Sequence, residues 1–317
     1  MPGNLPAENQ SSGQFAKSVP APLILAVDTT SLQSSLAIVR GTELLASLTD
    51  QSGRTHSQTL FENLDTLLRQ AQLTLAQLDG FAVTIGPGSF TGLRVGIAAI
   101  KGLAHTLRRR AIGITTIDAW ALTPRVTGKV VVMIDAMRGE VFCGLREAKH
   151  LDGEYSLSNP GQDMAAAPEI AIARMAASLS GEAAVFVGSG AVRYHELIAR
   201  EAEQSGHQFQ SASFVTLPGS GTQPGSGLMP EQFVVPPSGG ADLRSRSKPP
   251  EGGTTNPARF PGLSLCSPHL WQLVTDQPAL APFVARYAAQ LLHTASPPAV
   301  QACYLRPADA EIKFPLL

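Results

Sequence analysis

The stretch LILAVDTTSLQSSLAIV, residues Leu23 to Val39, shows the pattern on which the chain is built. A short apolar run ends in Asp28, and the polar turn TTSLQS leads into a second apolar run, SLAIV. A third run, ELLASL, follows Arg40 and Gly41. Short apolar runs bounded by turn residues are typical of β-strands. We therefore predict three strands in quick succession, forming an antiparallel meander.

Helical periodicity follows the third strand. In THSQTLFENLDTLLRQA, residues 55–71, apolar side chains recur at three- and four-residue spacing, and Thr55 with Gln58 fits a Thr-x-x-Gln capping box. The run FAVTI, a glycine-rich loop, a second helix to about Leu107 and the short strand AIGIT come next. This part of the chain is predicted to have the order βββαβαβ.

The second half of the chain repeats this order. VVVMID, the turn AMRGE and the run VFCGL repeat the design of strand, Asp, turn and strand, now around Asp135. AAVFVGSGAV repeats the design of strand, glycine turn and helix seen in FAVTIGPGSF, with Gly188 in the place of Gly86. We therefore predict a duplicated α/β lobe, with an N-terminal lobe over 23–125 and a C-terminal lobe over 126–215 plus 263–317. In the latter, WQLVTDQPALAPFVARYAAQLLH, residues 271–293, has helical periodicity.

Two segments have the composition of disordered chain. Residues 1–22 are polar and contain Pro, Ser and Gly, and residues 216–262 are dense in the same three residue types. Such segments bury too little apolar surface to offset the entropy of ordering, so we expect a disordered tail and a disordered insertion. The tail has no continuous apolar run, which predicts neither a signal peptide nor a membrane anchor and favours a cytoplasmic protein.

The charge and cysteine content of the chain argue against several classes of function and site. The formal net charge of −1 gives no overall attraction to nucleic acid or membranes. The three cysteines lie far apart and form no C-x-x-C motif. This argues against a disulfide framework and against a structural zinc site.

The glycine-rich loop TIGPGSFTGLRVG, Thr84 to Gly96, suggests a phosphate site at first sight. It lacks the lysine of a P-loop, and its G-x-G-x-x-x-G spacing is one residue longer than the dinucleotide fingerprint. Backbone N–H groups at the start of the following helix can still hold an anion, with Ser89 or Thr91 as the cap.

Close packing is the alternative use of these glycines. Gly92 and Gly96 form a small-xxx-small pair that Ala98, Ala99 and Gly102 continue along the helix. Small side chains let a helix approach a sheet, another helix or another subunit closely. We favour packing over phosphate binding at this loop.

Other residues suggest sites that the pattern supports less well. Asp28 and Asp135 each end a strand, where a carboxylate can hold a Mg²⁺–nucleotide, but the turn after Asp28 has neither glycine nor lysine. His56 begins a helix, yet Leu60 stands where a second metal ligand would be needed, so a capping or interface histidine is favoured. The residues left as candidates for an anion or nucleotide contact are Asp28, Thr29, Gly86, Gly88, Ser89 and Thr91.

Together these stretches resemble the TsaB (YeaZ) family. LAVDTTSLQSSLAIV is similar to that family's opening hairpin, RTHSQTL to the start of its first helix, and IDAMRGEVF to its second-lobe hairpin. GPGSFTGLRVGIAAIKGLAH resembles its most specific signature, G-P-G-S-F-T-G-[LV]-R-[IV]-G, and CYLRPADA its C-terminal segment. The resemblance is strong from Leu23 to Leu145, looser in the rest, and leaves out the tail and the insertion.

The resemblance implies an actin-like ATPase/ribonuclease-H-like (ASKHA) fold of two duplicated βββαβα-type lobes, in agreement with the repeat. It also implies a role in forming N6-threonylcarbamoyladenosine (t6A) at adenosine 37 of tRNAs that read codons beginning with A. In that pathway a homologous TsaD subunit, which carries a metal-binding H-x-x-x-H motif, transfers the threonylcarbamoyl group. This chain lacks that motif at His56 and Leu60. The resemblance therefore implies a non-catalytic partner without metal or intrinsic cofactor.

The partners implied are a TsaD-type subunit, a TsaE-type ATPase and tRNA bound through the complex, with no membrane contact. An ATP or ADP shared at the TsaD interface and a homodimer of the isolated chain are both compatible with this reading. The family's contact with TsaD is built from N-lobe helices. Carried over to this chain, the predicted interface consists of Thr55, His56, Leu60, Phe61, Leu64, Gly92 and Gly96.

Two other functions stay open from the sequence. One is a metal- or nucleotide-dependent enzyme of the same superfamily, either an ATPase or an M22-type glycopeptidase. The other is a direct tRNA-binding module that uses Arg94, Lys101 and the run Arg108–Arg110. The neutral overall charge and the absence of aromatic residues interleaved with this basic patch disfavour the latter.

Overall fold

The structure is a computed structural model that describes residues 20–123, 126–151, 154–212, 233–235, 263–264 and 269–305. The tail predicted over 1–22 and the insertion predicted over 216–262 lie largely outside these residues. Within the insertion the structure describes one short strand, β12 (Phe233–Val235), which pairs with β3. None of the helices in the described ranges has the length and apolar character needed to cross a membrane.

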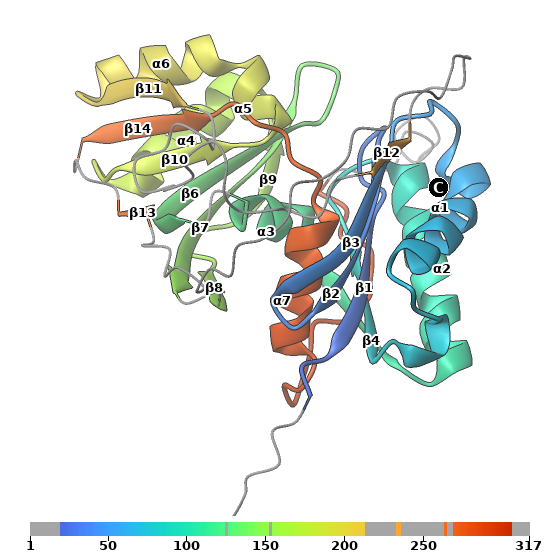
Figure 1. The fold of residues 1–317 in the computed structure, drawn as a ribbon. Coiled ribbons are helices and arrows are strands. Elements are labelled where there is room, and N and C mark those ends of the chain that lie inside the picture. Colours follow the sequence, from blue (N-terminus) through green and yellow to red (C-terminus); the bar gives the residue numbers. More distant parts are fainter. Residues whose placement is uncertain are drawn as a thin grey trace, which may run out of the picture.

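The N-terminal lobe is a six-stranded sheet in the order β12-β3-β2-β1-β4-β5 (Figure 1). The predicted meander is confirmed, since β2 is antiparallel to both β1 and β3, while β4 and β5 continue parallel to β1. The strands are β1 (Leu23–Asp28), β2 (Ser34–Arg40), β3 (Glu43–Asp50), β4 (Gly80–Thr84) and β5 (Arg110–Ile114).

Helices cover both faces of this sheet. Helices α1 (His56–Gln70) and α2 (Phe90–Leu107) lie on one face, with the 3₁₀ turn η1 (Leu75–Gln77) between them in the chain. Helix α1 begins and ends within one residue of the predicted range 55–71, and α2 ends at Leu107, as predicted. The opposite face is covered by α7 (Ala281–Leu291), which comes from the far end of the chain (Figure 1).

The C-terminal lobe repeats this topology. Its sheet has the order β11-β14-β10-β6-β7-β8, in which β7 is antiparallel to β6, and β10 and β14 run parallel to it. Thus β7-β6-β10-β14 matches β2-β1-β4-β5, which confirms the predicted fold of two duplicated lobes. The strands are β6 (Val126–Asp135), β7 (Val141–Leu151), β8 (Glu154–Ser158), β9 (Met164–Ala166), β10 (Ala184–Val187), β11 (Gln208–Ala212), β13 (Leu263–Ser264) and β14 (Leu270–Val274). The helices are α4 (Pro168–Leu179), α5 (Ser189–Arg193) and α6 (His195–Gln204).

One helix of each lobe packs on the sheet of the other lobe. Helix α3 (Thr116–Ala121) follows the last strand of the N-terminal lobe but packs on β6 and β7, whereas α7 follows β14 and packs on β1, β2 and β4. One continuous apolar core therefore joins the two lobes, with Trp120 of α3 and Val284 of α7 among its buried members. Burial of each large apolar side chain stabilises such a core by about 1.5–3 kcal/mol.

The helix predicted from the periodicity of residues 271–293 is wrong in its first part. Leu270–Val274 forms the parallel strand β14, and only Ala281–Leu291 is helical. Pro278 separates the two elements. A buried run of four or five apolar residues fits a strand and a helix equally well by pattern alone.

Candidate functional site

The glycine-rich loop packs against the turn between β1 and β2. The Ser89 N–H donates to the carbonyl oxygen of Thr30 at 2.8 Å, and Thr29 Oγ1 donates to the carbonyl oxygen of Gly92 at 2.8 Å. A Cβ atom at Gly88 would collide with Thr30, and one at Gly92 or Gly96 with Thr29. The glycines therefore allow close packing, as predicted, but the partner is this chain's own turn.

The first turn of α2 is capped within the same loop. Ser89 Oγ accepts from the backbone N–H of Gly92 at 3.2 Å, which confirms Ser89 as the cap, and Thr91 is exposed beside it. The N–H groups of Ser89 and Gly92 thus have partners inside the protein. An anion contact at this loop stays a prediction.

A C-terminal segment fixes the other side of the loop. The Cys303 N–H donates to the carbonyl oxygen of Ile85 at 2.7 Å, and the Gly113 N–H donates to that of Pro298 at 3.1 Å. Gly86 has a φ of +106°, and a Cβ there would collide with the Cys303 carbonyl oxygen. Residues 298–303 therefore cross the ends of β4 and β5, a contact that no local pattern in the sequence indicates.

Asp28 lies at the end of β1 with only 4% of its surface exposed. Its Oδ1 accepts from the hydroxyls of Thr84 and Thr30, each at 2.7 Å, and from the Thr30 N–H at 3.1 Å. Burial raises the pKa of this carboxyl, while these hydrogen bonds oppose the rise. Asp28 therefore faces threonine hydroxyls inside the protein. Its contact with a nucleotide stays a prediction.

Asp135, the equivalent aspartate of the C-terminal lobe, also accepts hydrogen bonds within the protein. Asp135 Oδ2 accepts from Arg193 Nη1 at 2.6 Å, and Oδ1 accepts from the Met137 N–H at 2.9 Å. Gly188 has a φ of +103° and packs against Met133, as Gly86 packs against Cys303 in the first lobe. Across the described ranges, no three His, Cys, Asp or Glu side chains converge on a common point.

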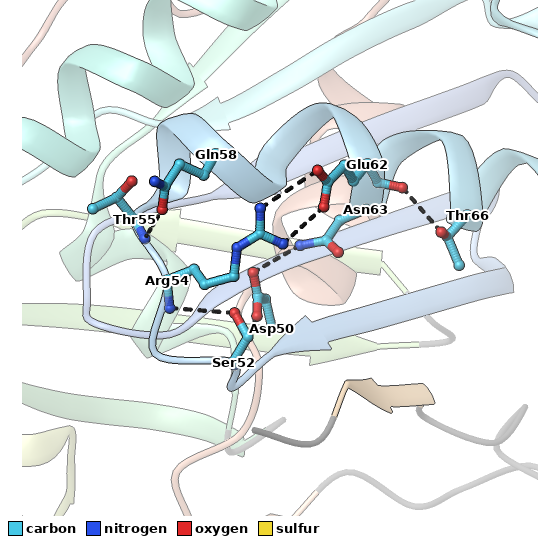
Figure 2. A network of polar contacts seen from close by, with 8 residues as sticks. All are labelled: Asp50, Ser52, Arg54, Thr55, Gln58, Glu62, Asn63 and Thr66. Atoms are coloured by element: carbon cyan, nitrogen blue, oxygen red, sulfur yellow. Dashed lines mark hydrogen bonds and ion pairs between the residues drawn. The ribbon is translucent and has the colours of Figure 1, made fainter. Parts of the chain in front are cut away.

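A polar network fixes the start of α1 (Figure 2). Asp50, at the end of β3, accepts from the Ser52 N–H at 2.8 Å and from Asn63 Nδ2 at 2.9 Å. Burial acts to raise the pKa of Asp50, but hydrogen bonds from its neighbours outweigh it and hold the pKa at about 2. The Arg54 guanidinium donates to Glu62 at 3.0 Å. The loop before α1 is therefore tied to the helix at two points.

The predicted interface residues of α1 divide between its two faces. Leu60 and Leu64 are 2% and 5% exposed and lie in the core under the sheet, whereas Phe61 is 59% exposed. Thr55 is the exposed N-cap, and its N–H donates to Gln58 Oε1 at 3.2 Å, as the capping box predicts. His56 Nε2 lies 2.8 Å from the carbonyl oxygen of Ser31. Leu60, Leu64, Gly92 and Gly96 are therefore buried inside the lobe, whereas Thr55 and Phe61 are exposed.

An open apolar groove runs between α1 and α2. Phe61 flanks it on α1, and the small residues Ala98, Ala99 and Gly102 form its floor on α2. A Cβ at Gly102 would meet nothing within 4 Å. The groove encloses about 260 Å³ and is completed by Leu75, Leu103, Thr106 and Leu107. Leu75 lies on η1, and the other three lie on the last two turns of α2. The predicted interface did not include these four residues.

Comparisons with known proteins indicate the family of this chain. The family model described as "TsaD: tRNA N6-adenosine threonylcarbamoyltransferase" matches residues 46–213, just over half of the chain. An uncharacterized protein of Mycobacterium tuberculosis is 33% identical over 155 residues, which cover 47% of this chain and 71% of that protein. The tRNA threonylcarbamoyladenosine biosynthesis protein TsaB of Bacillus subtilis is 29% identical over 128 residues, which cover 40% of this chain and 56% of TsaB.

Among solved structures, YeaZ from Pseudomonas aeruginosa is similar to this chain with 28% identity and a TM-score of 0.48. The match covers 56% of this chain and 80% of YeaZ. With the family model over more than half of its length and relatives named TsaB, the chain belongs to the TsaB (YeaZ) family of tRNA threonylcarbamoyladenosine biosynthesis proteins.

Proposed function

We propose that this chain is a non-catalytic subunit of a threonylcarbamoyl-transferase complex that forms t6A at adenosine 37 of tRNAs reading codons that begin with A. It pairs with a TsaD-type subunit through the groove between α1 and α2. A TsaE-type ATPase and the tRNA join through that complex in the cytoplasm. The observation that carries the proposal is the open apolar groove on the N-lobe helices.

The shape and composition of the groove suit a helix of a partner subunit. Phe61 is a large exposed aromatic residue beside a floor of Ala98, Ala99 and Gly102. Small residues let a partner helix approach closely, and aromatic anchors dominate the binding energy of many interfaces. The groove also suits a second copy of this chain, so a homodimer of the isolated protein uses the same face.

The interior of the lobes supports a non-catalytic role. The strand-end carboxylates that hold a metal–nucleotide in related ATPases are Asp28 and Asp135 here. Asp28 is buried among threonine hydroxyls, and Asp135 is paired with Arg193. A nucleotide shared with TsaD therefore depends on groups of that partner. If the isolated chain hydrolyses ATP, the alternative of a superfamily enzyme replaces this proposal.

The test is co-purification with the TsaD-type subunit of the same organism, followed by an assay of t6A formation. Phe61→Asp places a charge in the groove and is expected to abolish pairing and t6A formation together. Ile170→Asp is the matched control, because Ile170 is 52% exposed on α4 in the other lobe. Its pairing is expected to stay normal. Normal pairing of the Phe61 variant, or t6A formation by TsaD without this chain, overturns the proposal.

A further inference from the structure

Three side chains, two from α2 and one from the C-terminal segment, meet at the start of α2. The guanidinium carbon of Arg94 lies 3.9 Å from the ring centroid of Phe90. The ring centroids of Phe90 and Tyr304 are 5.3 Å apart, at an interplanar angle of 39°. We call Phe90, Arg94 and Tyr304 the aromatic–arginine cluster.

The backbone holds this cluster in place. Tyr304 directly follows Cys303, whose N–H donates to Ile85 at 2.7 Å, so the C-terminal segment carries the ring to the start of α2. Phe90 and Arg94 are one turn apart on the helix and share a face. The cluster is thus preorganised by hydrogen bonds that lie outside it.

The cluster is exposed and carries a positive charge. Tyr304 is 46% exposed, and Arg94 is exposed as well. Across the described residues, none of the ion pairs involves Arg94, and the first turn of α2 contains no acidic residue. The hydroxyl-bearing residues Ser89 and Thr91 lie exposed beside it. An aromatic face next to an exposed guanidinium and hydroxyls can hold a nucleobase and its phosphate.

The basic run at the other end of α2 does not extend this surface. Arg110 Nη1 donates to the carbonyl oxygens of Leu292 and Thr294, at 2.7 and 3.2 Å. Arg109 donates to the carbonyl oxygen of Ala76 at 3.5 Å. The sequence pattern showed no aromatic residue interleaved with the basic patch. The structure supplies one from the C-terminal segment, at the Arg94 end only.

We propose that the aromatic–arginine cluster binds a single-stranded segment of RNA, with a base stacked on the exposed face of Tyr304 and a phosphate bound by Arg94. The inference rests on the proposed function, in which the RNA is the tRNA that the complex modifies. The cluster lies on the same helix as the docking groove, since Arg94 is one turn before Ala98. RNA held there is close to the partner subunit.

The experiment uses the complex with the TsaD-type subunit and a fluorescently labelled, unmodified anticodon stem-loop RNA, whose Kd is measured by anisotropy at several salt concentrations. Tyr304→Leu is expected to weaken binding about tenfold, because it removes base stacking. Tyr304→Phe keeps the ring and is expected to bind normally. Arg94→Gln is expected to weaken binding and to lower the slope of log K against log salt by about 0.7.

Arg200→Gln is the charge-matched control, because Arg200 is exposed on α6 of the other lobe. It is expected to change neither the Kd nor the salt slope. Unchanged RNA binding in the Tyr304→Leu and Arg94→Gln complexes overturns the proposal. Loss of pairing with TsaD in these variants also overturns it and assigns the cluster to the protein interface. If the wild-type chain fails to pair at all, the proposed function fails, and the same titration on the isolated chain still decides whether the cluster binds RNA.

Discussion

Gly92 lies so close to Thr29 that a Cβ atom on the glycine would collide with the Thr29 carbonyl oxygen. The Thr29 hydroxyl in turn donates to the carbonyl oxygen of Gly92 at 2.8 Å. The start of α2 and the turn after β1 therefore form one packed unit. The small-residue stripe of α2 serves two purposes: Gly92 and Gly96 pack inward, whereas Gly102 opens onto the groove.

Because of this difference, replacing Gly92 or Gly102 with alanine is expected to have opposite effects on the stability of the protein. Gly92→Ala is expected to destabilise the protein by about 1–3 kcal/mol, because backbone must move to admit the new Cβ. Gly102→Ala is expected to stabilise it by up to about 1 kcal/mol, because alanine favours the helix and the site is open. Denaturant unfolding of both variants measures the two free energies. Equal stability of the two variants would refute the packing described for Gly92.

The buried carboxyl of Asp28 is expected to make the free energy of unfolding depend on pH. Burial raises its folded-state pKa above the ordinary 3.8, so the folded protein binds this proton more tightly than the unfolded chain. The stabilising effect of the proton is full below 3.8 and is lost as pH rises through the folded pKa. Asp28→Asn keeps an acceptor oxygen but does not titrate. The free energy of unfolding of this variant, relative to wild type, is therefore expected to rise with pH above about 4. A difference that stays flat from pH 4 to 8 would contradict the raised pKa.

Asp50 is expected to give stability a pH dependence of opposite sign to that of Asp28. Its pKa of about 2 lies below the ordinary 3.8, so its stabilising effect is present above 3.8 and is lost as pH falls through about 2. Asn63→Leu removes the 2.9 Å donor to Asp50 seen in Figure 2. It is expected to raise the pKa of Asp50 and to cost about 1–2 kcal/mol at neutral pH.

Thr66→Val is the control for Asn63→Leu. Thr66 Oγ1 donates only to the carbonyl oxygen of Glu62 within the same helix, on the exposed face of α1. Its loss is expected to change stability by less than about 0.5 kcal/mol. An NMR titration of Asp50 in both variants reports the pKa directly. If the pKa of Asp50 is unchanged in Asn63→Leu, the hydrogen bond from Asn63 does not contribute to lowering it.

The duplicated fold was predictable because its landmarks are local. Each lobe opens with a strand ending in an aspartate, Asp28 or Asp135, and each has a glycine turn, at Gly86 or Gly188, whose backbone only glycine adopts readily. These features follow from the backbone itself. They appear in the sequence at regular separation without any knowledge of tertiary contacts.

The proposed docking face was only partly predictable. Periodicity shows that α1 is amphipathic, but Leu60, Phe61 and Leu64 are all apolar, and only the sheet decides which of them it covers. The contact between Tyr304 and Phe90 depends on a C-terminal segment returning to the first lobe. Contacts between residues so far apart in the chain leave no trace in a local pattern.

The buried side chain of Arg146 is expected to contribute strongly to the stability of the contact between the two lobes. Its side chain, 3% exposed on β7, donates through Nε to Asp118 of α3 at 2.5 Å and through both Nη atoms to Asp163 at 2.7 and 2.8 Å. Asp118 lies on α3, which follows the N-terminal lobe in the chain but packs on the C-terminal lobe. The arginine therefore holds α3 to β7. Burial acts to lower the pKa of Arg146, but the two carboxylates outweigh it and raise the pKa above its ordinary value, which keeps the arginine charged.

Arg146→Met is expected to cost about 3–5 kcal/mol, because it leaves two partly buried carboxylates without their cation. Arg146→Lys keeps the charge but loses the two-pronged contact with Asp163, and is expected to lie between the methionine variant and wild type. In the triple variant Arg146→Met, Asp118→Asn and Asp163→Asn, no unpaired charge remains, and much of the stability is expected to return. Denaturant unfolding of the three variants tests this order. If Arg146→Met alone is as stable as wild type, the ion pairs contribute nothing to holding α3 on the second lobe.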